Sequence, residues 1–343
     1  MTVIHGRNGQ GKTNLLEAVH VLAAGASHRA ASADVMVRDG YERALVTGAV
    51  DGSGARVTLE IPQRGKWRAA VNGQVVRRRS EALGKVRAVM FSPDDLDIVK
   101  GAPAGRRAFV DVAAVLLRPL VADRQSELER VLRQRSALLR SARSRGVRPV
   151  GIDAWNEQLL RHGLAVISDR LTFLSSLAAA VRLVHARLAG ADAAMLDLSY
   201  RLSWGDVVAP GAAVTEGAFT AALDSAATAE RERGVTLVGP HRDDLVIRLG
   251  DADARTHASQ GESRTIALAL RLAVHELAAT TGETPTLLLD DVVSELDADR
   301  AHALLATIPG HQALITTADD PDRLGLATGA KRVLVDQGRL TER

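Results

Sequence analysis

A glycine-rich loop close to the first residue constrains the fold of this chain more than any other feature. The loop reads Gly6-Arg7-Asn8-Gly9-Gln10-Gly11-Lys12-Thr13, which is two glycines around four residues followed by Lys-Thr. The preceding Thr2–His5 is typical of a short buried strand, and Asn14–Leu22 is typical of an amphipathic helix. A strand, a glycine loop and a helix in this order predict an α/β domain with a phosphate-binding loop.

Each residue type in this loop has a chemical reason. Glycines let backbone N–H groups curl around phosphate oxygens, and the helix N-terminus adds its partial positive charge. Lys12 is predicted to reach the β- and γ-phosphates, and Thr13 is predicted to ligate Mg²⁺. The alternative is a glycine turn beside a surface lysine. We expect the loop, Asn14 included, to bind a nucleoside triphosphate, with ATP and Mg²⁺ as cofactors.

Composition excludes several classes of protein. The 343 residues, 46% of them hydrophobic, suffice for about two domains. The chain has no cysteine, which excludes a disulfide framework and suits the cytosol, and no apolar run approaches the roughly 20 residues of a membrane helix. Lysine occurs only five times, so arginine carries nearly all the positive charge of a chain with net charge +3. Arginine binds phosphate well, which favours a nucleic-acid partner, although a GC-rich coding sequence would also enrich it.

Periodicity predicts an α/β domain that is interrupted by helices. Alternating strand patterns occur before residue 92, a helical pattern occupies the middle of the chain, and strand patterns return at 196–204 and 236–249. We expect a first half of the ATPase lobe over 1–108, a mainly helical second lobe over 109–231, and the second half of the ATPase lobe over 232–343.

An acidic strand supplies the carboxylates that the glycine loop lacks. Thr286–Asp291 is an apolar strand that ends in two carboxylates. We expect Asp290 to lie at the end of the strand beside the loop strand, where it would ligate Mg²⁺ with Thr13. Asp291 would polarise the attacking water, so Lys12, Asp290 and Asp291 are the predicted catalytic residues. The alternative is a helix N-cap pair after a buried strand.

Two further segments resemble parts of the ATP-binding-cassette ATPases. Ser259-Gln260-Gly261-Glu262 precedes a strongly helical run, as the signature motif does, although ordinary helix N-caps use the same residue types. Ser294–Asp297 follows the acidic strand, where that superfamily has its D-loop. The order and spacing of the four motifs carry the resemblance. It implies that Ser259, Gln260, Gly261, Glu262 and Asp297 complete the nucleotide site of a second protomer, so that ATP joins two heads in a homodimer.

A set of longer segments spans nearly the whole chain, and several of them are unusual among cassette ATPases. They are Gly9–Ala18, Phe91–Leu96, Val99–Gly101, Arg106–Asp111, Arg130–Arg135, Gly239–Leu245, Ser259–Thr265 and Leu287–Asp297. With these segments the chain resembles the RecF family of bacterial recombination and repair ATPases. The resemblance implies a mixed sheet flanked by helices, split by a mainly helical second lobe.

The same resemblance implies the activity. It implies ATP-dependent binding of gapped DNA or of duplex next to a single strand, dimerisation on ATP, and slow, DNA-stimulated hydrolysis. RecR and RecO would be the partners in loading recombinase. An ABC-transporter subunit would need a Q-loop glutamine and a switch histidine, where this chain has Ser92-Pro93-Asp94 and Thr316-Thr317. A clamp that binds ATP without hydrolysing it shares every residue with the ATPase and stays open as an alternative.

DNA contacts and the start of the chain are the remaining expectations. Arg77, Arg78, Arg79, Arg106 and Arg107 are candidate DNA contacts, with an arginine series between Arg130 and Arg143 as a further set. For that series a solvated helix face paired with Glu127 and Glu129 is the alternative. RecF relatives carry strands before the loop strand, whereas Met1 begins on it. We favour a misplaced translation start over a truncated chain, which would leave an uncovered sheet edge.

Overall fold

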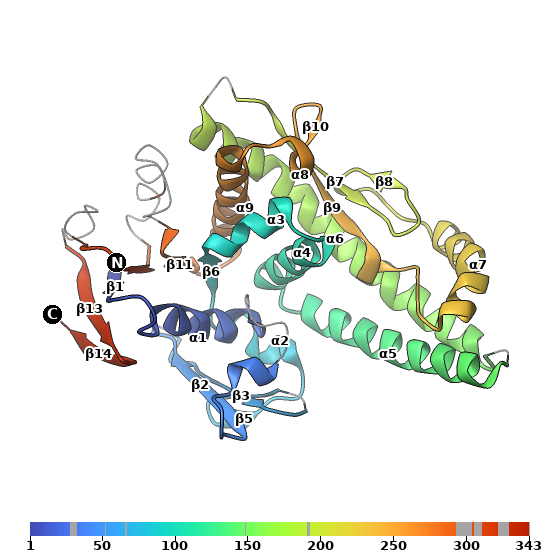
Figure 1. The fold of residues 1–343 in the computed structure, drawn as a ribbon, viewed down its shortest axis with the longest axis horizontal. Helices are drawn as coiled ribbons and strands as arrows, with labels where there is room; N and C mark the ends of the chain where they lie inside the picture. The colour runs from blue at the N-terminus through green and yellow to red at the C-terminus, as the bar shows by residue number, and fades with distance from the viewer. Residues whose placement is uncertain are drawn as a thin grey trace. The chain divides into compact units, whose positions relative to one another are not determined.

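In the computed structural model, the chain divides into two units (Figure 1). Unit 1 comprises Met1–Leu96, Leu183–Ala193 and Gln260–Arg343, and unit 2 comprises Asp97–Arg182 and Ala194–Ser259. The structure describes residues 1–27, 33–51, 53–65, 67–147, 149–190, 193–292, 304, 311–321 and 329–342. The three-part division of the sequence at 108 and 231 remains a prediction.

The main sheet of unit 1 brings the two ends of the sequence together. Its six strands lie in the order β14 (Arg339–Glu342), β13 (Lys331–Asp336), β1 (Thr2–His5), β12 (Ala313–Thr317), β11 (Thr286–Asp290) and β6 (Ala88–Phe91). All neighbours are parallel except β13 and β14. In Figure 1 the blue β1 therefore lies among red and orange strands from the end of the chain. The predicted mixed sheet flanked by helices is confirmed.

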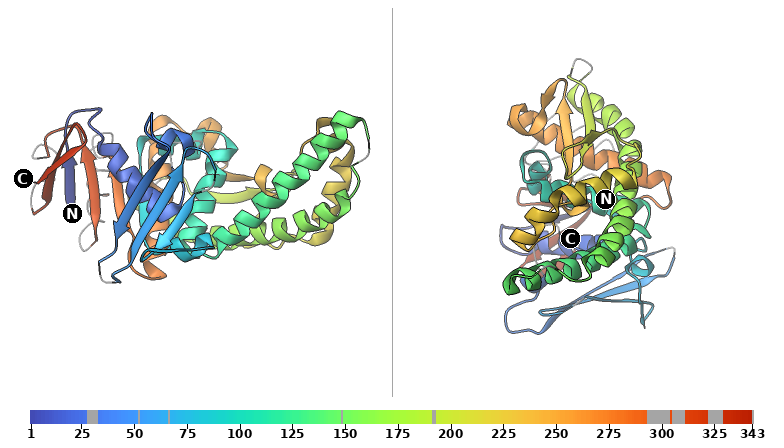
Figure 2. Two further views of the ribbon diagram at one scale, coloured as in Figure 1. Left: turned by 90° about the horizontal axis from the view of Figure 1, so that it is seen from below. Right: turned by 90° about the vertical axis from the view of Figure 1, so that its right-hand side faces the viewer.

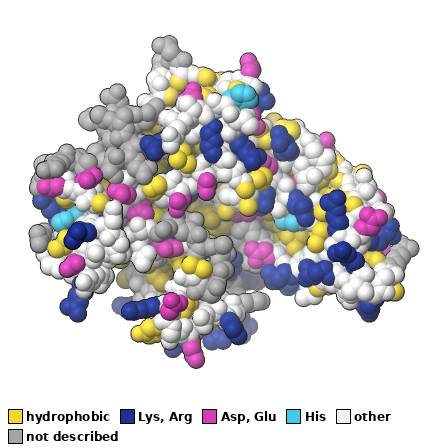
Figure 3. Space-filling model, in the orientation of Figure 1, with side chains coloured by type: hydrophobic (Ala, Val, Ile, Leu, Met, Phe, Trp, Pro, Cys, Tyr) yellow, Lys and Arg dark blue, Asp and Glu magenta, His cyan; other side chains and the backbone are white. Residues whose placement is uncertain are grey.

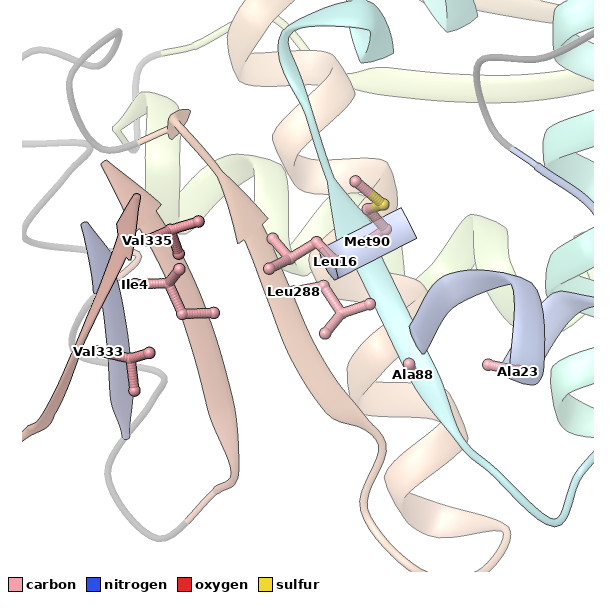
Figure 4. Packing of buried hydrophobic residues seen from close by; sticks show 8 residues of the cluster. All are labelled: Ile4, Leu16, Ala23, Ala88, Met90, Leu288, Val333 and Val335. Atoms are coloured by element: carbon pink, nitrogen blue, oxygen red, sulfur yellow. The ribbon is translucent and has the colours of Figure 1, made fainter. Parts of the chain in front are cut away.

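Helices cover both faces of this sheet. Leu16 and Ala23 of α1 (Lys12–Ala24) pack against Ile4, Met90 and Leu288 in one buried cluster (Figure 4). Phe91, the neighbour of Met90, instead lines a small cavity with Ala267 and Leu268 of α9 (Gln260–Thr280). Because side chains alternate along a strand, α1 and α9 cover opposite faces. Leu16 and Leu288 are fully buried, so truncating either to alanine should cost about 2–5 kcal/mol.

A second sheet of unit 1 is an antiparallel meander, drawn in light blue in Figure 2. It consists of β2 (Arg43–Ala49), β3 (Arg56–Pro62), β4 (Arg68–Val71) and β5 (Gln74–Val75). Alternate residues of β3 are buried, namely Val57, Leu59 and Ile61. The Asn72-Gly73 turn joins β4 to β5 with φ of 51° and 82°, which is the backbone that a two-residue hairpin requires. The short helices η1 (Ala33–Met36), α2 (Arg79–Ala82) and η2 (Pro93–Asp95) complete the described part of this unit.

Unit 2 is mainly helical. Its helices are α3 (Leu96–Lys100), α4 (Pro103–Leu117), α5 (Val121–Arg145), α6 (Ile152–Ala189), α7 (Glu216–Arg233) and α8 (Ala254–His257), with the short η3 (Pro240–Arg242). The first residue of α3 and the end of α6 belong to unit 1. An antiparallel sheet is ordered β10 (Ala252–Asp253), β9 (Asp244–Leu249), β7 (Leu196–Arg201) and β8 (Val207–Val208). Helix α7 packs against α5 (Figure 2).

Helix α6 is the one described helix that is long and apolar enough to cross a membrane by length and composition alone. A buried core helix meets the same criteria, and half of its most apolar window is buried. Its Asp169 and Arg170 are buried and form ion pairs with Arg124 and Asp111. Both charges are paired with groups of the same unit, so α6 packs as a core helix of unit 2.

Candidate nucleotide-binding site

The glycine loop connects the carboxyl end of a central strand with a helix N-terminus. Strand β1 ends at His5, and α1 begins at Lys12 with Gly11 as its N-cap. Gly9 and Gly11 have φ of 79° and 101°, a left-handed backbone that glycine adopts without steric cost. The first N–H groups of α1 have no partner within the helix and point toward the loop. This arrangement can bind an anion, and Arg7, Asn8 and Asn14 are exposed around it.

The hairpin formed by β13 and β14 packs against the glycine loop. A Cβ on Gly6 would overlap the carbonyl oxygen of Val335 in β13, so only glycine allows this close approach. At the turn between β13 and β14, the Gln337 N–H donates to Oε1 of Gln10 at 2.5 Å. The Gly338 N–H donates to the Gln10 carbonyl oxygen at 3.0 Å. No sequence motif pointed to this hairpin.

Lys12 places a positive charge inside the loop. Its side chain is 7% exposed, and its Nζ donates to the carbonyl oxygens of Gly6 at 2.7 Å and Arg7 at 3.2 Å. An ammonium group in this position can neutralise an anion held by the backbone N–H groups of such a loop.

Thr13 and Asp290 meet although 277 residues separate them. The Thr13 Oγ1 donates to Oδ1 of Asp290 at 3.0 Å, and Asp290 is 6% exposed. The expected neighbouring strands were wrong, because β12 lies between β1 and β11. Helix α1 nevertheless reaches Asp290, since it packs across β12 and β11. A hydroxyl and a carboxylate oxygen are ligands that Mg²⁺ prefers.

Thr316 connects both carboxylate residues of the acidic strand. It lies opposite Asp290 in the β11–β12 register and is 1% exposed. Its Oγ1 donates to Asp290 Oδ1 at 2.7 Å and accepts from the Asp291 N–H at 3.0 Å. Asp291 has φ of 54°, a backbone that costs a non-glycine residue about 1–2 kcal/mol. These bonds hold Asp291 in that conformation. Thr316 entered the sequence reasoning only as a departure from transporters.

The signature residues lie at the exposed start of α9. Ser259, Gln260, Gly261 and Glu262 are exposed, whereas Ser263 is buried. A Cβ on Gly261 would meet nothing within 4 Å, so the site leaves room for an incoming group. The D-loop candidate Asp297 lies outside the described residues.

An open cavity of about 690 Å³ adjoins the glycine loop. Its polar lining residues are His5, Arg7, Asp319, Asp320 and Arg332. Its volume lies in the range of small-molecule sites. Within the described ranges, no three His, Asp or Glu side chains gather as a metal cluster. A site built on Thr13 and Asp290 has no need of one, because phosphate oxygens would supply further ligands.

The structure corrects part of the predicted DNA set. Arg77, Arg78 and Arg79 are exposed, and Arg79 donates to the Gly25 carbonyl oxygen. Arg106 is 3% exposed, and its guanidinium binds both carboxylate oxygens of Asp244 at 2.7 and 2.9 Å. Its assignment as a DNA contact is therefore wrong, because its donors are buried and occupied.

Arg107 and the arginines of α5 differ in the groups that they contact. Arg107 is half-buried and donates to the Asp243 carbonyl oxygen, and its pKa is lowered by burial and then by neighbouring Arg170. Arg130 and Arg133 pair with Glu127 and Glu129, as the alternative interpretation held. Arg135 is 2% exposed and pairs with Glu230 at 2.5 Å. The burial of Arg135 could be inferred from the sequence, because this residue lies on the apolar stripe of Leu128, Val131, Leu139 and Ala142.

Comparisons with known proteins agree with this geometry. The family described as RecF/RecN/SMC N terminal domain matches residues 1–325. The DNA replication and repair protein RecF of Acidothermus cellulolyticus is 43% identical over 331 residues, which cover 94% of this chain and 89% of that protein.

Solved structures of the recombination mediator protein RecF in the RecFOR pathway are similar as well. The structure with ATPrS has a TM-score of 0.86 and the structure with ATP one of 0.87, both at 29% identity. The similarity covers 99% and 100% of this chain, and 91% of each RecF chain. A Smc head domain with a coiled coil and joint from Pyrococcus yayanosii shares the fold alone, with a TM-score of 0.50 and 14% identity over 100% of this chain and 92% of that one. The chain belongs to the RecF family of DNA replication and repair proteins.

Proposed function

We propose that this chain binds ATP with Mg²⁺ at its glycine loop and uses the nucleotide to control binding to DNA during recombinational repair. The observation that carries the proposal is the 3.0 Å contact between Thr13 Oγ1 and Asp290 Oδ1, beside the Lys12 ammonium. These are the residue types that hold a magnesium-bound triphosphate, and they converge from distant parts of the sequence.

The roles of the residues follow from their positions. When bound, Mg²⁺ would neutralise negative charge on the phosphate oxygens. Lys12 and the N–H groups of Gly6–Thr13 would bind the phosphate oxygens, and Thr13 and Asp290 would hold the ion. Asp291 accepts a proton from the attacking water, and Thr316 fixes the backbone that carries it. Slow, DNA-stimulated hydrolysis is the activity that we expect.

The exposed signature supports a site completed by a second copy of the chain. Ser259, Gln260, Gly261 and Glu262 lie at the N-terminus of α9, which carries partial positive charge. We propose that they bind the γ-phosphate in the partner's glycine loop, with Asp297 beside them, so that ATP drives dimerisation. RecR, RecO and gapped DNA are the proposed partners in the cytosol, by relationship to RecF.

Substitution of Lys12 tests the nucleotide site. Lys12→Ala should abolish Mg²⁺-dependent binding of fluorescent ATP and any hydrolysis with or without duplex DNA. Lys331→Ala is the matched control, because Lys331 is an exposed lysine of the same unit that pairs with Glu342. Unchanged ATP binding by Lys12→Ala would refute the assigned site.

Sedimentation tests the composite site. ATP should convert wild-type protein into a dimer, while Ser259→Arg should bind ATP and remain a monomer. Turnover measured on the same samples separates an ATPase from an ATP-switched clamp, because the two share every residue and differ only in hydrolysis.

A further inference from the structure

The end of α7 and the segment that joins it to β9, together residues 233–243, lie against α5 within unit 2. A Cβ on Gly234 would lie 3.4 Å from Arg140 Cα and 3.1 Å from Arg143 Cδ. Arg143 donates to the Arg233 carbonyl oxygen at 3.1 Å, and the hydroxyls of Ser136 and Thr236 are 3.3 Å apart. Arginines from α5 and from the segment therefore share one surface.

The same segment adds arginines at its other end. Arg242 is exposed, and its Nε donates to the Thr236 carbonyl oxygen at 2.9 Å. Arg107 of α4 donates to the Asp243 carbonyl oxygen at 2.8 Å. Each bond uses one of the five N–H donors of a guanidinium, so most donors of these side chains stay available. We call the surface formed by Arg107, Arg140, Arg143, Arg233 and Arg242 the basic face.

Buried arginines neutralise the carboxylates beneath the basic face. Asp244 pairs with Arg106, Glu230 with Arg135, and Asp111 with Arg170. The sequence carries no acidic residue between Glu129 and Asp153, which includes the second half of α5. Glu232 is the exposed carboxylate on the described segment from Arg231 to Arg242. The basic face thus keeps a positive charge, and Figure 3 shows Lys and Arg side chains gathered over the part of the molecule that contains α5 and α7.

The charge on this surface belongs to arginine alone. Burial lowers the pKa of His241 to about 4, so its imidazole is neutral at physiological pH. The pKa of Arg107 is lowered by burial and by Arg170, so an anion beside it would stabilise its charged form. Trp204 stacks on Phe219 with ring centroids 5.3 Å apart, and no aromatic side chain belongs to the basic face. Such a surface suits phosphates better than unstacked bases.

We propose that the basic face binds the phosphate backbone of duplex DNA, independently of base sequence. The inference rests on the proposed function and names the surface that contacts the DNA. Guanidinium groups pair with phosphate oxygens, and each contact releases condensed counterions, so affinity should fall steeply with salt. The basic face replaces Arg106 as the contact surface and gives the Gly239–Leu245 motif a function.

Two double variants with the same change in net charge test the proposal. Arg140→Gln with Arg233→Gln removes two cations of the basic face whose side chains form no hydrogen bond or ion pair among the described residues. Arg130→Gln with Arg133→Gln removes two cations of the same helix that already pair with Glu127 and Glu129. Binding of a short fluorescein-labelled duplex is measured with ATP and Mg²⁺ over a range of salt concentrations.

The first variant should weaken duplex binding at least tenfold. The slope of log binding constant against log salt concentration should become shallower by about 2, since each lost phosphate contact contributes about 0.9 to it. The second should leave the slope unchanged. Wild-type protein that binds no duplex would overturn the proposed function itself. Wild-type binding with equal losses in both variants, or with no loss in the first, would overturn the basic face alone. Arg140→Lys with Arg233→Lys keeps the charge and should bind duplex as wild type does, which separates the loss of charge from a defect in folding.

Discussion

Replacing Thr316 with valine should both destabilise the carboxyl end of β11 and weaken Mg²⁺ binding at Asp290. Valine keeps the shape of threonine in β12 but removes the Oγ1 that donates to Asp290 at 2.7 Å and accepts from the Asp291 N–H at 3.0 Å. A buried hydrogen bond to a charged group contributes about 1.5–3 kcal/mol. The Asp291 N–H can still donate to the Thr316 carbonyl oxygen at 3.3 Å, so losing its bond to Oγ1 costs little free energy. We therefore expect Thr316→Val to lower the free energy of unfolding by about 2 kcal/mol.

Urea unfolding without nucleotide measures this change, and a Mg²⁺ titration of ATP binding measures its effect on the site. Thr316→Val should require more Mg²⁺ for half-maximal binding, because Asp290 is less firmly oriented. Thr316→Ser keeps the hydroxyl and should restore the Mg²⁺ requirement. Thr317→Val is the matched control, since Thr317 is equally buried but its Oγ1 accepts from Asp319 rather than contacting Asp290. Unfolding free energy and Mg²⁺ requirement that both equal those of wild type would refute the role of Thr316.

Three further changes test other contacts. Burial raises the pKa of Asp243 to about 6 from 3.8, so the folded chain holds a proton that the unfolded chain loses, and stability falls as pH rises through this window. Relative to wild type, Asp243→Asn should gain about 2 kcal/mol of stability as pH rises from about 4.5 to about 7.5, measured by urea unfolding at each pH; a constant difference would contradict this assignment. Gln10→Ala removes the acceptor of the Gln337 N–H and should weaken ATP binding several-fold with little change in unfolding, whereas equal affinity would show that the hairpin does not position the loop. Gly6→Ala should destabilise unit 1, because its Cβ would overlap the Val335 carbonyl oxygen, and a melting temperature equal to that of wild type would disprove the clash.

The sequence allowed the main elements of the site to be predicted because their signals are local. The glycine loop lies between β1 and α1, and Asp290 ends an apolar strand, as the residue patterns indicate. The Asn72-Gly73 turn follows from the positive φ that both residues tolerate. These features depend on neighbours in sequence, so periodicity and turn chemistry suffice to find them.

Contacts that depend on strand order were not predictable in this way. Parallel strands are joined by long crossovers, so no local pattern revealed that β12 separates β1 from β11 or that Thr316 faces Asp290. The Gln10 contact with Gln337 likewise joins residues far apart in sequence. Arg106 looked like a surface cation because its partner Asp244 lies 138 residues away.

The place of β1 in the sheet has a consequence for synthesis of the chain. Thr2 pairs with Leu314 on one side and Lys331 on the other, so both neighbours of β1 come from the far end of the printed sequence. At elongation rates of about 5–20 residues per second, β1 waits on the order of tens of seconds with both edges unpaired. A ribosome that stops before β12 would release a glycine loop with no sheet beneath it. Nucleotide binding by this chain therefore also requires that synthesis has passed β12 and β13.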